Sequence, residues 1–186
     1  MIWFTSDTHF GHANVIKFDN RPFTNIDEHD QGLIKNWNSV VGKGDVVYHL
    51  GDVMSHKRNE WFDNRLDEVL GALHGTLILI LGNHDLTNPP IMKHKRWSKV
   101  CHYQEITYLG QKIVLFHYRM VVWNRSHHGS WALHGHSHGS LPVNYQAKTF
   151  DVGTMCWDYH PISFDQVAEE MSKHTFVPVD GHKGDL

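Results

Sequence analysis

Three histidines alternate with other residues in the segment LHGHSHG, residues 133–139: His134, His136 and His138. Neutral imidazole is a common metal ligand. The segment reads as a strand that runs into a loop, and side chains two residues apart on a strand share a face, roughly 6.5 Å from one another at about 3.3 Å per residue. Two of these rings can therefore converge on one metal ion or on two neighbouring ions. For this segment alone, a polar strand end with solvated imidazoles is an equal alternative.

Polar residues that can bind metals also follow the other short apolar runs of the chain. These runs cover residues 2–5, 46–50, 77–81 and 113–116 and read as strands. The side chains that follow them are Asp7 and His9 after the first run, Asp52 after the second, Asn83, His84 and Asp85 after the third, and His117 after the fourth. Loops at the carboxyl ends of strands converge in α/β sheets. With residues 133–139 included, five strand ends carry metal-capable side chains, which predicts one metal centre.

The donor types indicate which metals such a centre would hold. Carboxylate, amide and imidazole donors without thiolate suit Mn²⁺, Fe or Zn²⁺ rather than a structural cysteine-zinc site. Two metal ions roughly 3.5 to 4 Å apart need a bridging carboxylate. Asp52 is the natural candidate, because Gly51 before it allows a tight turn against the metals. We therefore expect two divalent metal ions as cofactors, with Mn²⁺ favoured over Fe or Zn²⁺.

The elements that must position these residues follow an alternating order. Helical patterns at about residues 28–41 and 59–73 separate the first three strands, and the segment SFDQVAEEM opens a last helix, where Ser163 and Gln166 have the spacing of a capping box. Later strands near residues 101–106, 131–134 and 149–152 lack intervening helices and suggest a second, mixed sheet. We expect a layered α/β fold in one domain over residues 1–186, with a frayed tail after about residue 179.

The overall composition excludes several classes of partner. The chain has 186 residues and a formal net charge of −3, so no global positive field attracts nucleic acid or an anionic membrane. No signal peptide is visible, and the longest aliphatic run, residues 77–81, is too short to cross a bilayer. Cys101 and Cys156 lack metal-site spacing, and we expect them to be reduced core thiols of a cytoplasmic protein.

The ordered set D-x-H, G-D, G-N-H-D, H and G-H-x-H resembles the calcineurin-like metallophosphoesterases. The segments DTHFGHANVI and NRPF resemble the small single-domain bacterial and phage members, and the resemblance covers about residues 2–164. It implies a two-sheet sandwich flanked by helices. The ligand set that it implies is Asp7, His9, Asp52 and His138 for one metal, and Asp52, Asn83, His117 and His136 for the other. His84 would stand beside the metals as the acid or the phosphate-contacting group, and His134 would pack or hydrogen-bond behind them.

Four further residues are candidates for substrate contact or for support of a ligand. His12 follows the first two predicted ligands and is a candidate for substrate contact. Asp85 would orient His84 or cap the next turn. Arg119, where the family often has proline, is a candidate phosphate fork. Asp151 would accept a hydrogen bond from a ligand imidazole, or would only end a strand in a turn.

The basic run Lys93–Lys99, KHKRWSK, is a weaker feature. A grip on phosphate or on a stacked base is one interpretation. A solvated helix face is the simpler one, and we favour it.

These features predict metal-dependent hydrolysis of a small, nucleotide-like phosphodiester by a metal-bridging hydroxide, with His84 assisting the leaving oxygen. The alternatives are a phosphomonoesterase acting on a small metabolite and a non-catalytic scaffold of the same fold. Protein phosphatases carry G-D-x-x-D-R, whereas this chain has GDVMSH, with Ser55 and His56 in the last two places, which disfavours protein substrates. The expected partner is a small phosphorylated substrate, with no long nucleic acid and no membrane, and nothing in the sequence indicates an oligomeric state.

Overall fold

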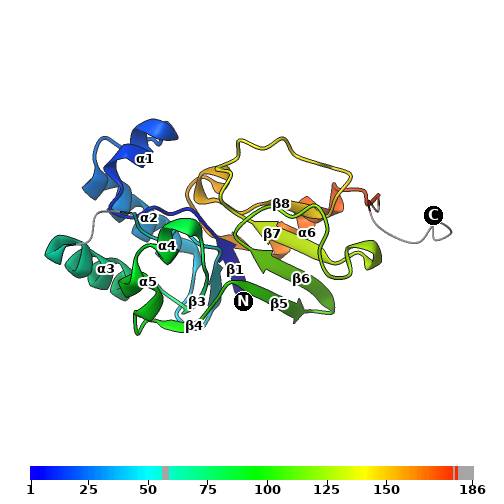
Figure 1. The fold of residues 1–186 in the computed structure, drawn as a ribbon, viewed down its shortest axis with the longest axis horizontal. Coiled ribbons are helices and arrows are strands. Elements are labelled where there is room, and N and C mark those ends of the chain that lie inside the picture. The colour runs from blue at the N-terminus through cyan, green and yellow to red at the C-terminus, as the bar shows by residue number, and fades with distance from the viewer. Residues whose placement is uncertain (56–58, 178, 180–186) are drawn as a thin grey trace.

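The computed structural model describes residues 1–55, 59–177 and 179 (Figure 1). The tail predicted to fray after about residue 179 lies outside the described residues. The elements, in chain order, are β1 (Ile2–Thr5), α1 (Ala13–Phe18), α2 (Ile26–Val40), β2 (Val46–His49), α3 (Glu60–Ala72), β3 (Thr76–Ile80), α4 (Asn83–Leu86), α5 (Pro89–Lys93), β4 (Trp97–Cys101), β5 (Tyr103–Tyr108), β6 (Gln111–Phe116), the 3-10 turn η1 (Ser126–His128), β7 (Trp131–His134), β8 (Thr149–Asp151), the 3-10 turn η2 (Thr154–Trp157), β9 (Ile162–Ser163) and α6 (Phe164–Ser172).

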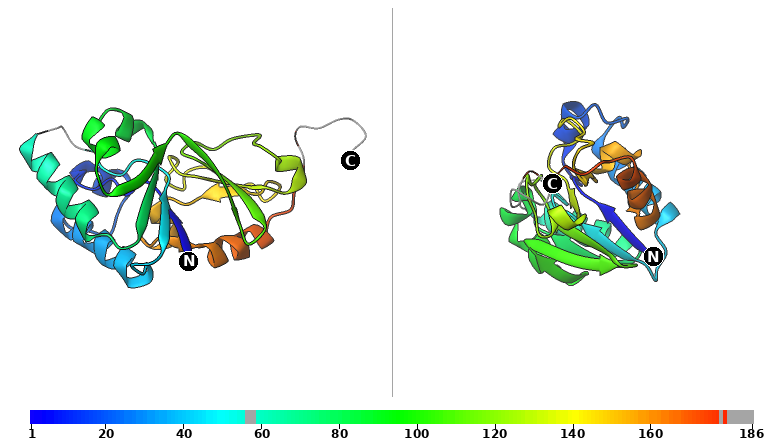
Figure 2. Two further views of the ribbon diagram at one scale, coloured as in Figure 1. Left: turned by 90° about the horizontal axis from the view of Figure 1, so that it is seen from below. Right: turned by 90° about the vertical axis from the view of Figure 1, so that its right-hand side faces the viewer.

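The strands form two sheets. The first has the order β4-β3-β2-β1-β9, in which β1 to β4 are parallel and β9 is antiparallel to β1. The second has the order β5-β6-β7-β8, in which β5 is antiparallel to β6 and the other neighbours are parallel. A β-bridge between Ser6 and Gly153 joins the segments that follow β1 and β8. The predicted α/β fold, a two-sheet sandwich flanked by helices, is confirmed, and the second sheet is mixed as expected (Figures 1 and 2).

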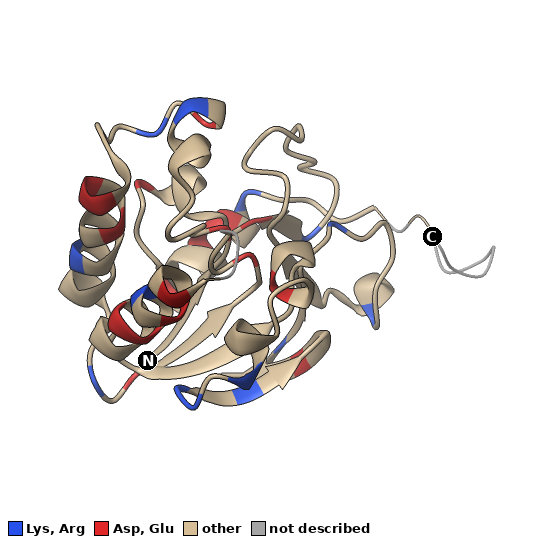
Figure 3. Ribbon diagram, turned by 60° about the vertical axis from the view of Figure 1, so that its left-hand side comes forward, with Lys and Arg blue, Asp and Glu red and all other residues tan. Residues whose placement is uncertain are grey.

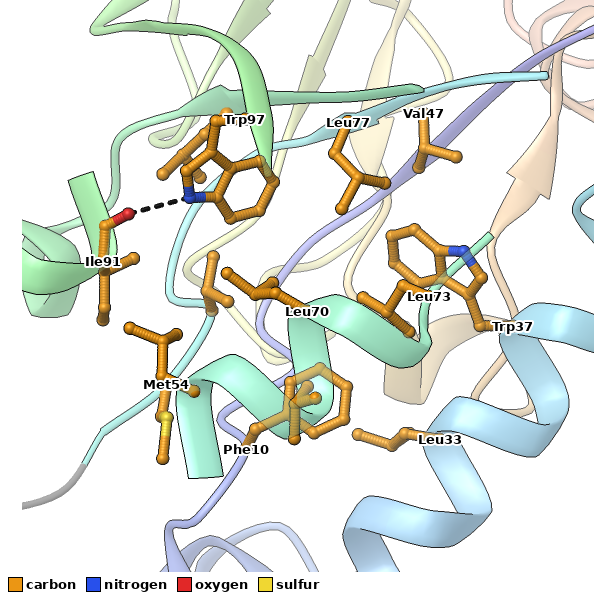
Figure 4. Close-up of a cluster of buried hydrophobic side chains, with 14 of the residues drawn as sticks. Phe10, Leu33, Trp37, Val47, Met54, Leu70, Leu73, Leu77, Ile91 and Trp97 are labelled. Carbon is orange, nitrogen blue, oxygen red and sulfur yellow. Dashed lines mark hydrogen bonds between the residues drawn. The ribbon is translucent and has the colours of Figure 1, made fainter. Parts of the chain in front are cut away.

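Alternate side chains of the first sheet enter two separate cores, because successive strand residues point to opposite faces. On one face, Trp3, Val47 and Leu77 pack with α2 and α3, and Figure 4 shows part of this cluster. On the other face, Phe4 and Ile80 pack with buried side chains of β6, β7 and α6. The first sheet therefore lies between the helices and the second sheet, and this fixes the loops that leave its carboxyl edge.

The three predicted long helices are present at nearly the expected bounds. The side chains of Asn25 and Asn59 cap α2 and α3 by accepting hydrogen bonds from backbone amides of the first turn. Ser163 and Gln166 form the predicted capping box at the start of α6.

The interpretation of the basic run Lys93–Lys99 as a solvated helix face is wrong. The run ends α5 and begins β4, which pairs in parallel with β3. The Trp97 side chain is buried and its indole donates a hydrogen bond to the carbonyl of Ile91, while Arg96 donates to the carbonyls of Leu73 and Gly75. These two residues hold β4 and are not free to grip a base or a phosphate.

The two cysteines were expected to be reduced thiols in the core. Cys101 and Cys156 are free thiols, but Cys156 is exposed, so its placement in the core was wrong. Among the described helices, none combines the length and the apolar character that crossing a membrane requires. Figure 3 shows basic and acidic residues interspersed over the elements in that view.

Candidate metal centre

The loops after five strands, β1, β2, β3, β6 and β7, bring the predicted ligands together at one edge of the fold. Asp7 and His9 follow β1, and their backbone amides donate hydrogen bonds to the carbonyls of Gly51 and Asp52 in the loop after β2. The loop after β7 joins them, since the backbone amide of His136 donates to the Asp7 carboxylate at 3.0 Å. This convergence is the one expected at the carboxyl ends of strands.

One group of donor atoms comes from Asp7, His9 and His138. Their ligand atoms all lie within 4.8 Å of one another. The Nε2 atom of His138 is 3.6 Å from Oδ1 of Asp7 and 3.2 Å from Nε2 of His9. Asp7 and His9 are buried, whereas His138 is half-buried.

A second group comes from Asp52, His117 and His136, again with ligand atoms within 4.8 Å of one another. The Oδ1 atom of Asn83 lies 3.2 Å from Nε2 of His117 and so belongs to the same place. The Oδ2 atom of Asp52 lies 3.5 Å from Nε2 of His117 and 3.8 Å from Nε2 of His9, which places this carboxylate between the two groups.

The donor set fits divalent cations by its chemistry. It holds two buried carboxylates, one amide oxygen and four imidazoles, and it contains no sulfur. Such a mixture suits Mn²⁺, Fe or Zn²⁺. These groups of residues could hold metal ions, and that they do so stays a prediction.

The backbone is turned into an uncommon conformation at five of these positions. Asp7, His9, Asp52, His136 and His138 have φ values of 54°, 50°, 58°, 67° and 48°, in the left-handed region. That region costs a residue other than glycine on the order of 1–3 kcal/mol, and such positions cluster at functional sites. The turns aim these side chains into a common space.

Two glycines allow the loops after β2 and β3 to touch behind the donors. Gly51 has a φ of +93°, and a Cβ atom there would lie 2.4 Å from the amide nitrogen of Gly82. A Cβ atom on Gly82 would lie 2.3 Å from Oδ1 of Asp52. Both positions therefore require glycine, and at Gly51 this agrees with the tight turn expected from the sequence.

Asp85 lies behind the Asp52 loop and not against the ring of His84. Its buried carboxylate accepts hydrogen bonds from the backbone amides of Asp52 at 2.8 Å, Val53 at 3.0 Å and Gly82 at 2.9 Å. Of the two roles considered, the structure gives Asp85 that of a cap at the start of α4, and adds a hold on the backbone of Asp52.

His84 and His12 lie beside these two groups. A ring nitrogen of His84 also lies within 4.8 Å of ligand atoms of His9 and Asp52, so these three residues form a third group that could hold a metal ion. The backbone amide of His84 donates to Oδ1 of Asp52 at 2.9 Å, and its ring lies 5.2 Å from the ring of His9. Ser55 contacts Nδ1 of His84 at 3.2 Å, while His56 lies outside the described residues. The His12 ring is 5.7 Å from that of His9, and its buried Nδ1 has no hydrogen-bond partner in the part of the chain that is described.

Arg119 and Asp151 both contact backbone groups. The phosphate contact of Arg119 stays a prediction, and Asp151 takes the second role considered for it, that of a turn at the end of a strand. The guanidinium of Arg119 donates to the carbonyl of Pro142 at 3.1 Å. The carboxylate of Asp151 accepts from the backbone amides of Gly139 and Gly153 and so supports the loops, not an imidazole.

His134 is buried behind the loop that carries His136, with Nδ1 3.0 Å from the carbonyl oxygen of Gly135. This is the position behind the ligands that the resemblance implied.

Three residues at the site were not singled out from the sequence. Tyr118 packs its ring against those of His117 and His136 at 4.9 and 4.7 Å. Asp19 accepts a hydrogen bond from Nδ1 of His138 at 2.8 Å, and Arg21 holds Asp19. Arg21 lies in the segment NRPF that carried the resemblance, and Asp19 directly precedes that segment, but no role was assigned to either residue.

The charges of the first group are coupled. Burial lowers the pKa of His9 to about 3, so its ring is a neutral donor. Burial opposes ionisation of Asp7, yet the imidazoles of His138, His117 and His9 hold its pKa well below its ordinary value. Burial favours neutral His138 as well, but the carboxylates of Asp7 and Asp19 outweigh it and raise the pKa to about 9. In the absence of metal, the proton on the ring is thus stabilised by its two carboxylate neighbours.

Two relatives match nearly the whole chain. An uncharacterised protein of Methanocaldococcus jannaschii is 36% identical over 181 residues, which cover 95% of this chain and 94% of that protein. The gene 66 protein of Mycobacterium phage D29 is 29% identical over 197 residues, covering 90% of this chain and 94% of its own. No protein-family model matches the chain.

A solved structure has the same fold. A protein of unknown function from Aquifex aeolicus aligns with a TM-score of 0.70 and 25% identity over 91% of this chain and 98% of its own. A phosphoesterase from E. coli aligns with a TM-score of only 0.41 at 21% identity, which is too remote to support a functional conclusion.

Proposed function

We propose that this chain, which belongs to the same family as the uncharacterised Methanocaldococcus jannaschii protein, is a metal-dependent phosphoesterase with a dinuclear centre. One observation carries the proposal: the Asp52 carboxylate lies 3.8 Å from Nε2 of His9 and 3.5 Å from Nε2 of His117, between two groups of donor atoms. A carboxylate in that position is what two neighbouring cations require. The motif order of the resemblance supports the same reading.

Two bound divalent ions would supply an activated water and would neutralise the charge of a phosphate ester. The residues of the chain supply the remainder. Asp7, His9 and His138 would hold one ion, Asn83, His117 and His136 the other, and Asp52 both. The Nδ1 atom of His84 faces Ser55, so Nε2 is the atom that would give a proton to the leaving oxygen.

The substrate we propose is a small phosphodiester, nucleotide-like, with Mn²⁺ as the favoured metal and a phosphomonoester as the second choice. The net charge of −3 disfavours a long polyanion, and Arg96 and Trp97 of the run Lys93–Lys99 are engaged by backbone carbonyls. Local positive charge would come from the metal ions, which suits a small anionic substrate.

The test is hydrolysis by the metal-depleted protein after addition of Mn²⁺. Bis(4-nitrophenyl) phosphate represents diesters, 4-nitrophenyl phosphate represents monoesters, and 2′,3′- and 3′,5′-cyclic nucleotides represent nucleotide diesters. We expect metal-dependent turnover, greater for diesters, and its loss in Asp52→Asn. The control is Asp27→Asn, because Asp27 is exposed and pairs only at the surface with Arg65. Metal-independent turnover, or an unaffected Asp52→Asn variant, would refute the proposal.

A further inference from the structure

Asp19 lies behind His138, on the side opposite the other donor atoms. We propose that Asp19 is a positioning residue, which fixes His138 for metal binding and strengthens the metal position that His138 forms with Asp7 and His9. The inference rests on the proposed metal centre and adds a role that the motif residues do not include.

The contact between Asp19 and His138 determines which nitrogen faces the metal position. The Oδ2 atom of Asp19 lies 2.8 Å from Nδ1 of His138. A carboxylate of this kind only accepts, so Nδ1 carries the proton and donates. The Nε2 atom then points to the other donors, 3.6 Å from Oδ1 of Asp7 and 3.2 Å from Nε2 of His9. Asp19 thereby fixes both the ring orientation and the tautomer that a metal ligand needs.

Arg21 holds Asp19 in that place. Its Nε and Nη2 atoms donate to Oδ2 of Asp19 at 3.2 and 3.0 Å. The same guanidinium donates to the backbone carbonyls of Asp7 and Thr8, both at 2.9 Å. The Arg21 side chain is fully buried. One rigid group therefore joins the loop after β1, which carries Asp7 and His9, to the carboxylate that orients His138.

The other half of the centre is built differently. The Nδ1 atom of His117 lies 2.6 Å from the carbonyl oxygen of Leu50, a neutral acceptor. An anionic partner makes an imidazole a stronger donor than a neutral partner does. The position made by Asp7, His9 and His138 also has Asp7 as a carboxylate of its own. We therefore infer stepwise metal binding, with the tighter position on the side that Asp19 supports.

The experiment is calorimetric titration of the metal-depleted protein with Mn²⁺ alone. Asp19→Asn removes the charge and keeps an oxygen acceptor, and Asp27→Asn is the charge-matched control on the exposed surface. We expect the tighter of two binding steps to weaken about 10–100-fold in Asp19→Asn, as for other partners of metal-bound histidine. The second step should change little, and Asp27→Asn should match the wild type. Asp19→Glu should show a smaller but measurable loss.

A double-mutant cycle tests whether the effect passes through His138. In a His138→Ala background, Asp19→Asn should cause no further loss of affinity in the Mn²⁺ binding that remains. Equal losses in both backgrounds, equal weakening of both steps, or wild-type affinity in folded Asp19→Asn would each overturn the proposal. If Asp19→Asn does not fold by circular dichroism, unchanged affinity in Asp19→Glu overturns it. A wild type that binds no Mn²⁺ refutes the metal centre itself, whereas a metal-binding wild type with an insensitive Asp19 refutes only this inference.

Discussion

The carboxylate of Asp85 accepts a hydrogen bond of 2.8 Å from the backbone amide of Asp52, although the two residues are 33 positions apart. Through this bond the start of α4 holds the loop whose carboxylate stands between the two groups of donors. The same carboxylate also accepts from Val53 and Gly82. A buried acceptor with three backbone donors is sensitive to any change that turns one oxygen into a donor.

We therefore expect Asp85→Asn to destabilise the metal-free protein. The NH₂ group of the asparagine would face at least one backbone N–H from which it cannot accept a hydrogen bond. Each buried donor left without a partner costs about 1–3 kcal/mol of stability. Urea unfolding in the presence of a chelator measures this loss. A change within about 0.5 kcal/mol, typical of surface substitutions, would show that Asp85 does not hold the Asp52 loop.

The stability of the metal-free protein should depend on pH because of His138. Its pKa is raised from the ordinary 6.5 to about 9 in the folded state, since Asp7 and Asp19 outweigh burial. A raised pKa contributes stability that is fully present below pH 6.5 and is lost as the pH rises through about 9. In thermal unfolding with chelator, the wild type should therefore lose more stability than His138→Gln as the pH rises from 6.5 to about 9. Parallel curves for the two proteins would contradict this assignment.

Substitution of His84 tests catalysis separately from metal binding. If Nε2 protonates the departing oxygen, the benefit depends on how poor the leaving group is, and general acid catalysis typically contributes about 10²–10⁴-fold. We expect His84→Asn to reduce turnover of an alkyl or nucleoside ester far more than turnover of a nitrophenyl ester, with metal content unchanged. Equal losses for both esters would mean that His84 only positions the phosphate. No loss for either ester would mean that the residue is not part of the machinery.

Long nucleic acid should bind weakly. Trp97 is buried and Arg96 is bonded to backbone carbonyls, so the run Lys93–Lys99 retains only its lysines for a polyanion. Filter binding with a long single strand measures the affinity. Submicromolar binding at about 150 mM salt, abolished when Lys93, Lys95 and Lys99 are neutralised, would contradict the expectation, because such binding depends on phosphate contacts.

The sequence predicted those features that depend on patterns of residues close together in the chain. The apolar runs and caps gave the central strands and the long helices, and the polar residues after each strand met at one edge because parallel strands end there. The short helices α1, α4 and α5 and the strands β4 and β9 were missed. For β4 the reason is that it depends on pairing with β3 and on burial of Trp97, which are tertiary effects.

The supporting contacts of the site were harder to predict. Asp19 and His138 are 119 positions apart, and no periodicity joins them. Asp151 was considered as the acceptor for an imidazole or as a strand-end turn. Its carboxylate accepts from backbone amides, as in the second role, and Asp19 is the residue that accepts from the ring of His138. A residue type suggests what a side chain can do, whereas the partner is decided by packing of segments distant in the chain.

Metal stoichiometry tests the proposed dinuclear centre most directly. The protein is depleted of metal, saturated with Mn²⁺ and freed of excess ion, and its metal content is measured by elemental analysis beside that of His138→Ala and Asp52→Asn. The shared position of Asp52 predicts close to two ions per chain for wild type, loss mainly of one ion in His138→Ala and weakened binding of both in Asp52→Asn. A wild-type content of zero or one ion at saturation would contradict the dinuclear centre.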